Sequence, residues 1–160
     1  MKLYIKEKVL DIRTRFFIKN ENDENVYEVT NKIFSFGKKS TISDMTGNKI
    51  AYIEQEIFKL LPKYNIYFND TFYCDMTKEF IFMKNNYSLS NGYTVKGDML
   101  MHNITIQDPS GNVICYINRE FFTIGDKYEI EIFDPNQLNI ILAISTVIAN
   151  EVNRKQDRND

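Results

Sequence analysis

The strongest constraint on the fold is an internal repeat that spans much of the chain. Residues 42–68 (ISDMTGNKIAYIEQEIFKLLPKYNIYF) align with residues 106–133 (IQDPSGNVICYINREFFTIGDKYEIEIF) at an offset of 64 residues that is constant through the last identical pair. The identical positions are Asp44, Gly47, Asn48, Tyr52, Ile53, Glu56, Phe58, Lys63, Tyr64 and Ile66, which match Asp108, Gly111, Asn112, Tyr116, Ile117, Glu120, Phe122, Lys127, Tyr128 and Ile130. Identity of this extent predicts that the fold is built from two similar halves.

A shorter unit recurs within the halves. Residues 56–66, 79–89 and 120–130 each begin with Glu, have Tyr eight residues later and an aliphatic residue two positions beyond it. Residues 32–42 fit with Lys and Ser at the two polar positions, and residues 8–18 fit more loosely. Each copy joins two segments of alternating apolar residues through a short connection with Gly, Pro or Asn, which is typical of a β-hairpin.

These hairpins predict a meander of about twelve strands followed by one helix. The strands are expected at residues 2–8, 15–20, 26–31, 39–44, 49–57, 63–69, 71–81, 86–90, 92–98, 102–108, 112–121 and 127–133. The helix is expected at 136–152, which makes residues 1–152 a single domain, and a charged tail follows at 153–160. A sheet of this size must protect its edges, and we expect a closed antiparallel barrel. Twelve strands leave an interior too wide for strand side chains alone, so the helix is predicted to fill it.

The charge-free run from Pro135 to Asn150 leaves three interpretations to weigh. At about 1.5 Å per residue its 16 residues span about 24 Å, which is short for a bilayer core of about 30 Å. A helix lying on a membrane should have one charged face, and this run has none. A helix that is apolar on every side is normally buried in protein. We therefore predict a core helix, with its axis formed by Leu138, Ile140, Ile141, Leu142, Ile144, Val147 and Ile148.

Net charge, cysteine content and the N-terminal residues limit the partners and the cellular compartment that can be expected. The net charge of −2 provides no overall positive field, so binding to anionic lipid requires a local patch, and nucleic acid is not expected as a partner. Cys74 and Cys115 form neither a disulfide framework nor a metal-ligand spacing. Charged residues at positions 2, 6, 7 and 8 interrupt any apolar N-terminal run, so no signal peptide is predicted. We expect a cytoplasmic protein that is not transmembrane, with peripheral association with the membrane as an open alternative.

The sequence gives little support for catalysis, and no catalytic, cofactor-binding or metal-ligating residue is predicted. His102 is the only histidine, so any His-dependent nucleophilic site would have to centre on it. Cys115 lies in an apolar segment and is expected to be buried. Three glutamates recur at one hairpin position, Glu56, Glu79 and Glu120. Paired carboxylates can perform acid–base chemistry, but recurrence in each copy favours a structural role. Gly37 and Gly125 lack the spacing of a phosphate-binding loop.

The pattern as a whole resembles a known family. It is carried by MKLYIKEKV (1–9), FSFGKK (34–39), DMTGNKIAYIEQEIFKLLPKYNIY (44–67), GDMLMHNITI (97–106), FFTIGDKYEIEI (121–132) and ILAISTVIA (141–149). These segments resemble the small bacterial members of the LURP-one-related family, in the Tubby C-terminal-like superfamily, to which phospholipid scramblases are also related. The resemblance implies a closed β-barrel threaded by its C-terminal helix. It implies lipid binding only as an option, because the chain has no calcium-loop pattern and Tubby's basic phosphoinositide site has no residue-by-residue match.

Basic residues near the N-terminus are the candidate ligand site. Even-numbered residues of the first strand share one face, because successive side chains alternate. The candidate patch for an anionic ligand consists of Lys2, Lys6, Lys8, Arg13, Arg15, Lys38 and Lys39. It predicts a non-enzymatic binding module for anionic phospholipid headgroups or an acidic partner at a membrane surface. The alternatives are a solvated strand face on a structural or self-associating interaction protein and, least favoured, a small-molecule carrier or enzyme.

Overall fold

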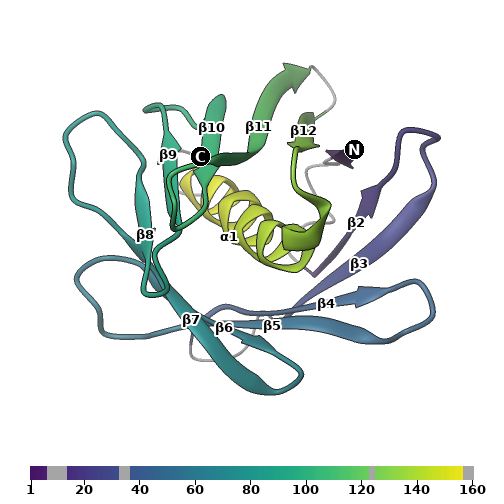
Figure 1. Cartoon of the computed structure of the whole chain (residues 1–160), viewed down its shortest axis with the longest axis horizontal. Helices are drawn as coiled ribbons and strands as arrows, with labels where there is room; N and C mark the ends of the chain where they lie inside the picture. Colours follow the sequence, from purple (N-terminus) through teal and green to yellow (C-terminus); the bar gives the residue numbers. More distant parts are fainter. Residues whose placement is uncertain (7–13, 33–36, 123–124, 157–160) are drawn as a thin grey trace.

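The computed structural model describes the chain except residues 7–13, 33–36, 123–124 and 157–160. It is a closed barrel of twelve antiparallel strands around a single long helix (Figure 1), which confirms the predicted architecture. The strands are β1 (Lys2–Lys6), β2 (Arg15–Lys19), β3 (Asn25–Lys32), β4 (Lys39–Asp44), β5 (Lys49–Gln55), β6 (Lys63–Phe68), β7 (Thr71–Lys78), β8 (Tyr87–Leu89), β9 (Thr94–Gly97), β10 (Asn103–Gln107), β11 (Val113–Phe122) and β12 (Gly125–Ile132).

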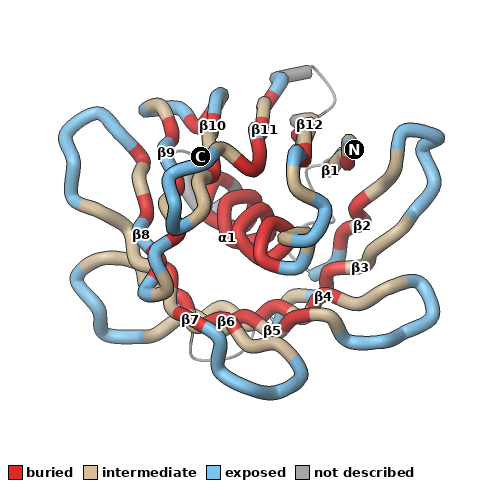
Figure 2. The backbone as a smooth tube through the Cα atoms, viewed as in Figure 1, coloured by how far each residue is buried: buried red, intermediate tan, exposed pale blue. Residues whose placement is uncertain are grey.

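Each strand pairs with its neighbours in the sequence, and the barrel closes where β1 pairs with β12, with Leu3 opposite Ile130. Because the chain reverses at every connection, the two ends of the barrel carry different sets of connections. We call the end where each odd-numbered strand joins its successor, as β5 joins β6, the loop end. The opposite end, which joins β2 to β3, β4 to β5 and the later even-numbered strands to their successors, we call the turn end. Its connections are exposed in Figure 2.

Hydrogen-bonded aspartates hold tight turns at the turn end. Asp44 Oδ1 accepts bonds from the hydroxyl of Thr46 at 2.7 Å and from the backbone N–H of Asn48 at 2.9 Å. The bond from Thr46, followed by those from Asn48, lowers the pKa of Asp44 to about 2. Asp108 forms the corresponding turn with Asn112, and these bonds also lower its pKa. The repeated Asp and Asn of the two halves are therefore turn residues.

The helix begins at the turn end and runs through the barrel. A short 3₁₀ helix, η1 (Pro135–Gln137), leads into α1 (Leu138–Gln156), and Asp134 caps this junction by accepting from the backbone N–H of Asn136 at 3.1 Å. The helix is buried from Ile140 to Val152 (Figure 2). It continues to Gln156, beyond the predicted end at 152, so four residues assigned to the tail are helical. Of the predicted axis, Leu138 is half-buried and the other six residues are buried. No helix in the described part of the chain is long and apolar enough to cross a bilayer.

The repeated tyrosines are core residues. Tyr64, Tyr87 and Tyr128, which follow the recurring glutamates by eight residues, are among the largest fully buried side chains. Tyr64 and Tyr87 lie near the loop end of their strands and Tyr128 in the middle of β12, and all three are buried where they help to fill the barrel. Burial thus explains the most regular feature of the hairpin unit.

Candidate functional site

The structure describes five of the seven predicted basic residues; Lys8 and Arg13 lie outside the described part. Lys2 and Lys6 face outward at opposite ends of β1, since Leu3 and Ile5 face the core. Arg15 is the first residue of β2 and Lys39 the first of β4. Lys6, Arg15 and Lys39 therefore lie toward the loop end, while Lys2 lies toward the turn end.

The outward-facing cations make ion pairs that are partly or fully exposed. Lys2 pairs with Glu129 at 2.8 Å, Arg15 with Glu28 at 3.4 Å, Lys39 with Glu54 at 2.8 Å, and Lys6 with Asp23. Hydrogen bonding to the carboxylate raises the pKa of Lys2 and of Lys39, so both remain fully protonated at neutral pH. Exposed pairs of this kind contribute little to stability and are screened by salt, so another anion can compete for the lysine.

Lys38 has a different role. Its ammonium donates a hydrogen bond of 2.6 Å to the backbone carbonyl of Asn150 in the last part of α1, where a cation also interacts favourably with the helix dipole. The Asn150 side chain in turn accepts from Asn31 at 3.1 Å and donates to the hydroxyl of Ser40 at 3.0 Å. The Lys38 side chain thus joins the helix to the barrel wall and does not extend toward solvent with the other cations.

The cations that remain belong to a larger feature, which we call the basic wall. The outward-facing positions of β1–β4 hold six basic residues and a single acidic one, Glu28. The basic residues are Lys2, Lys6, Arg15, Lys19, Lys32 and Lys39. Four of them, Lys6, Arg15, Lys32 and Lys39, lie at the strand ends nearest the loop end. Lys19 and Lys32 were not among the predicted residues, although their alternation with the buried Ile18 and Val29 was a signal for them.

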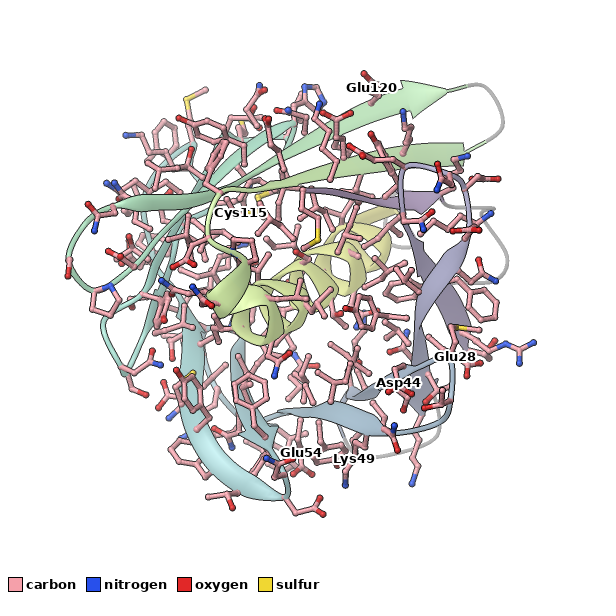
Figure 3. The ribbon with its side chains drawn as sticks, turned by 45° about the vertical axis from the view of Figure 1, so that its right-hand side comes forward. Glu28, Asp44, Lys49, Glu54, Cys115 and Glu120 are labelled. Atoms are coloured by element: carbon pink, nitrogen blue, oxygen red, sulfur yellow. The ribbon has the colours of Figure 1, made fainter. Side chains whose placement is uncertain are left out.

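Acidic residues of neighbouring segments reduce the excess charge of the basic wall without removing it. With the partners Asp23, Glu54 and Glu129 included, six basic residues face four acidic ones, counting Glu28. Lys32 is exposed and has no acidic partner among the described residues. The carboxylates of Glu28 and Glu54 project from the outer surface of the barrel in Figure 3. The wall is therefore a weakly positive strip on a chain that is negative overall.

The structure gives no support for a nucleophilic or metal site in the part of the chain it describes. Cys74 and Cys115 are free and buried, and burial raises the pKa of each thiol to about 12. Cys115 and Glu120 lie on one strand, but Cys115 lies beside the helix and Glu120 at the strand end (Figure 3). His102 lies in the β9–β10 connection, where its backbone N–H donates to Asp98 at 2.8 Å. No group of three metal-ligating side chains occurs within the described ranges.

Two of the recurring glutamates, Glu56 and Glu79, begin connections at the loop end, whereas Glu120 lies within β11, opposite Lys127 of β12. Glu56 pairs with Lys59 at 3.2 Å and with Lys63 at 3.3 Å, and the bond from Lys59 lowers its pKa. The backbone N–H of Glu79 donates to the carbonyl of Asn86 and closes the β7–β8 connection. These positions favour the structural interpretation of the glutamates.

A surface of large exposed apolar side chains at the loop end was not predicted from the sequence. We call residues 56–62, 79–86 and 98–102 the apolar loops; they are the connections at the loop end that the structure fully describes. The predicted strands 49–57 and 71–81 included part of them, whereas β5 ends at Gln55 and β7 at Lys78. Their large exposed apolar side chains are Ile57, Phe58, Leu60, Phe80, Ile81, Phe82, Met83, Met99 and Leu100. Runs of consecutive apolar residues, which break the alternation of a strand, were the available signal.

Comparisons with known proteins agree with this architecture. A family model described as LURP-one-related matches residues 1–149. Uncharacterized protein YxjI of Bacillus subtilis (strain 168) is 26% identical over 149 residues, covering 92% of this chain and 91% of the relative. An X-ray structure of a protein from Arabidopsis thaliana superposes with a TM-score of 0.66 at 12% identity, covering 93% of this chain and 89% of the other. The plant structure shows similarity of fold alone.

Proposed function

The chain belongs to the LURP-one-related family, and from this premise we propose that it is a non-enzymatic module that binds anionic phospholipid headgroups at a membrane surface. The observation that carries the proposal is the basic wall, with six outward-facing cations on four adjacent strands. Lys32, which has no acidic partner in the described part of the chain, is exposed to meet a phosphate, and the remaining cations can exchange their carboxylate partners for one. Attraction to an anionic leaflet contributes about 1 kcal/mol for each lysine or arginine near the surface.

A vesicle sedimentation assay tests this proposal. We expect the protein to sediment with phosphatidylcholine vesicles that contain phosphatidylserine, and the bound fraction to fall as salt is added, because screening weakens exposed charge interactions. Vesicles of phosphatidylcholine alone should bind more weakly. The absence of sedimentation with phosphatidylserine at low ionic strength would refute the proposal.

Charge reversals identify the surface that binds. Lys32→Glu should weaken binding to phosphatidylserine vesicles at least about tenfold, from the roughly 1 kcal/mol attributed to each cation and the added repulsion. The matched control is Lys49→Glu at the turn end, which makes the same change in net charge outside the basic wall. Equal effects of the two variants would show that overall charge, and not the wall, governs the association.

Self-association is the second candidate function, because the apolar loops expose large side chains that a second copy could cover. Light scattering at micromolar to millimolar concentration, without lipid, tests it. A concentration-dependent increase in mass that a serine substitution in these loops abolishes would support it. A monomer over the whole range would contradict it.

A further inference from the structure

We propose that the apolar loops insert into the boundary between headgroups and acyl chains of an anionic bilayer, so that the barrel stands on the membrane by its loop end. This inference rests on the proposed function in that it concerns the same membrane surface. It adds a contact region outside the basic wall, an orientation of the barrel and a component of binding that salt does not weaken.

The first observation is the exposure of the loop tips. Phe58 and Leu60 are 96% and 99% exposed, and Phe80 and Phe82 are 91% and 88% exposed. Side chains this exposed make almost no contact with the barrel, although most large apolar side chains in a folded protein are at least half covered. They project from two neighbouring connections at one end, and Met99 and Leu100 add more than half-exposed side chains from a third.

The second observation is that two of the apolar loops, 79–86 and 98–102, are held in place by hydrogen bonds. Asp98 accepts hydrogen bonds from the backbone N–H groups of Leu100, His102 and Asn103, at 3.1, 2.8 and 3.1 Å. The side-chain amide of Asn85 donates to the carbonyls of Asp98 and Met99, at 3.2 and 2.7 Å, and so ties the β7–β8 connection to the β9–β10 connection. These bonds fix the positions of the two connections and satisfy the polar groups that take part in them, which lowers the cost of placing the connections at a bilayer interface.

The distribution of charge favours one end of the barrel for the membrane. The described connections at the turn end contain six acidic residues and no basic one: Glu21, Asp23, Glu24, Asp70, Asp108 and Asp134. The described connections at the loop end contain three of each sign, with Lys38, Lys59 and Lys84 balancing Glu56, Glu79 and Asp98. Asp23 and Asp70 pair with lysines, but the other acidic residues leave the turn end less favourable for an anionic leaflet than the loop end, which meets it with apolar tips and with Arg15, Lys32 and Lys39 of the basic wall.

The form of the surface favours lipid over a protein partner. Separate tips with interspersed lysines match the interfacial pattern, in which apolar groups enter the boundary and cations remain with the phosphates. Between two apolar loops lies an open depression of about 440 Å³, lined by Phe82, Met83, Lys84, Asn85 and Met99. Its apolar lining with one ammonium fits the upper part of a lipid acyl chain below an anionic headgroup.

Fluorescence from introduced cysteines tests the orientation on the full chain. The two native cysteines are buried, with pKa values raised to about 12, so an environment-sensitive dye reacts with an introduced exposed cysteine. We expect dye on Leu60→Cys to shift to shorter wavelength with phosphatidylcholine–phosphatidylserine vesicles, and dye on Asn48→Cys at the turn end to remain unchanged. Equal responses of the two positions would overturn the orientation.

Loop substitutions test the energetic role of the tips. The double variant Phe80→Ser and Phe82→Ser should lower vesicle partitioning at least about tenfold, and the loss should persist at high salt, because it removes apolar contact. The matched control is Phe72→Ser, which removes an exposed phenyl ring near the turn end and should leave partitioning unchanged. Thermal unfolding of each variant verifies that the barrel is intact.

The two proposals fail in distinguishable ways. Binding that depends on Lys32 but not on the phenylalanines, with no shift at position 60, would overturn insertion and leave headgroup binding standing. The absence of binding to any vesicle would overturn both. Loss of self-association in the double variant, without vesicle binding, would assign the apolar loops to a contact between protein molecules.

Discussion

Thr146 lies in the middle of the central helix and offers a test of what a buried hydroxyl without a hydrogen-bond partner costs the barrel core. Its side chain is fully buried, and its hydroxyl has no hydrogen-bond partner among the described residues. The neighbouring Ser145 differs, since its hydroxyl donates to the carbonyl of Ile141 at 2.7 Å. An unsatisfied buried hydroxyl costs about 1–3 kcal/mol. Valine has nearly the same shape and is also β-branched, so Thr146→Val should remove this cost without changing packing or helix propensity greatly.

We therefore expect Thr146→Val to raise the free energy of unfolding by about 1–2 kcal/mol, which corresponds to an increase in Tm of about 2–8 °C for a chain of this size. Urea denaturation followed by circular dichroism measures the change, and the m-value should stay constant. The control Thr146→Ser keeps the hydroxyl and removes a methyl group, so it should lose about 1 kcal/mol. A Thr146→Val protein that is no more stable than the wild type, at equal m, would refute the reasoning.

Three further substitutions test particular contacts. Tyr64→Phe removes the hydroxyl that donates to the buried Glu151, and urea denaturation should show a loss of about 1–3 kcal/mol; an unchanged midpoint would contradict it. Gly37→Ala should cost more than Gly111→Ala in the same assay: both have positive φ, but only at Gly37 would a Cβ meet a backbone oxygen, at 2.5 Å. Asp44→Asn should lower Tm above about pH 4, the unfolded pKa, and this difference should fade as pH falls toward the folded pKa of about 2, which a pH series of melting curves would show.

The barrel could be predicted because its strands follow a simple alternation. Residues such as Leu3, Ile66 and Ile130 face inward at every second position, and Asp, Gly and Asn indicate the turns between strands. The helix could be predicted because a charge-free run too short for a bilayer must be buried in protein. Its C-terminal end was placed too early, since the charged residues after Val152 continue the helix and give no terminating signal.

The candidate site could be predicted only in part from the sequence. Which carboxylate meets which lysine depends on strand register: Lys2 lies opposite Glu131 in the β1–β12 pairing yet bonds to Glu129 two residues away. The direction of Lys38 depends on where the helix passes the wall, a contact between residues more than a hundred positions apart. Sequence alternation could identify the outward face of β1–β4 but not the acidic residues that other strands bring to it.

The internal repeat itself separates structural from functional residues. The tyrosine repeated in each hairpin unit is buried in all three described copies, and filling the barrel is sufficient reason for its recurrence. The two positions that follow the recurring glutamate are apolar in each copy, IF in 56–62 and FI in 79–86, yet Phe58 and Phe80 contact almost nothing in the described part of the chain. A core cannot account for their recurrence, and solvent exposure of phenylalanine carries a cost in solubility. The proposed insertion of the apolar loops into a membrane would explain why these residues recur at one end of the barrel while remaining uncovered by the described part of the chain.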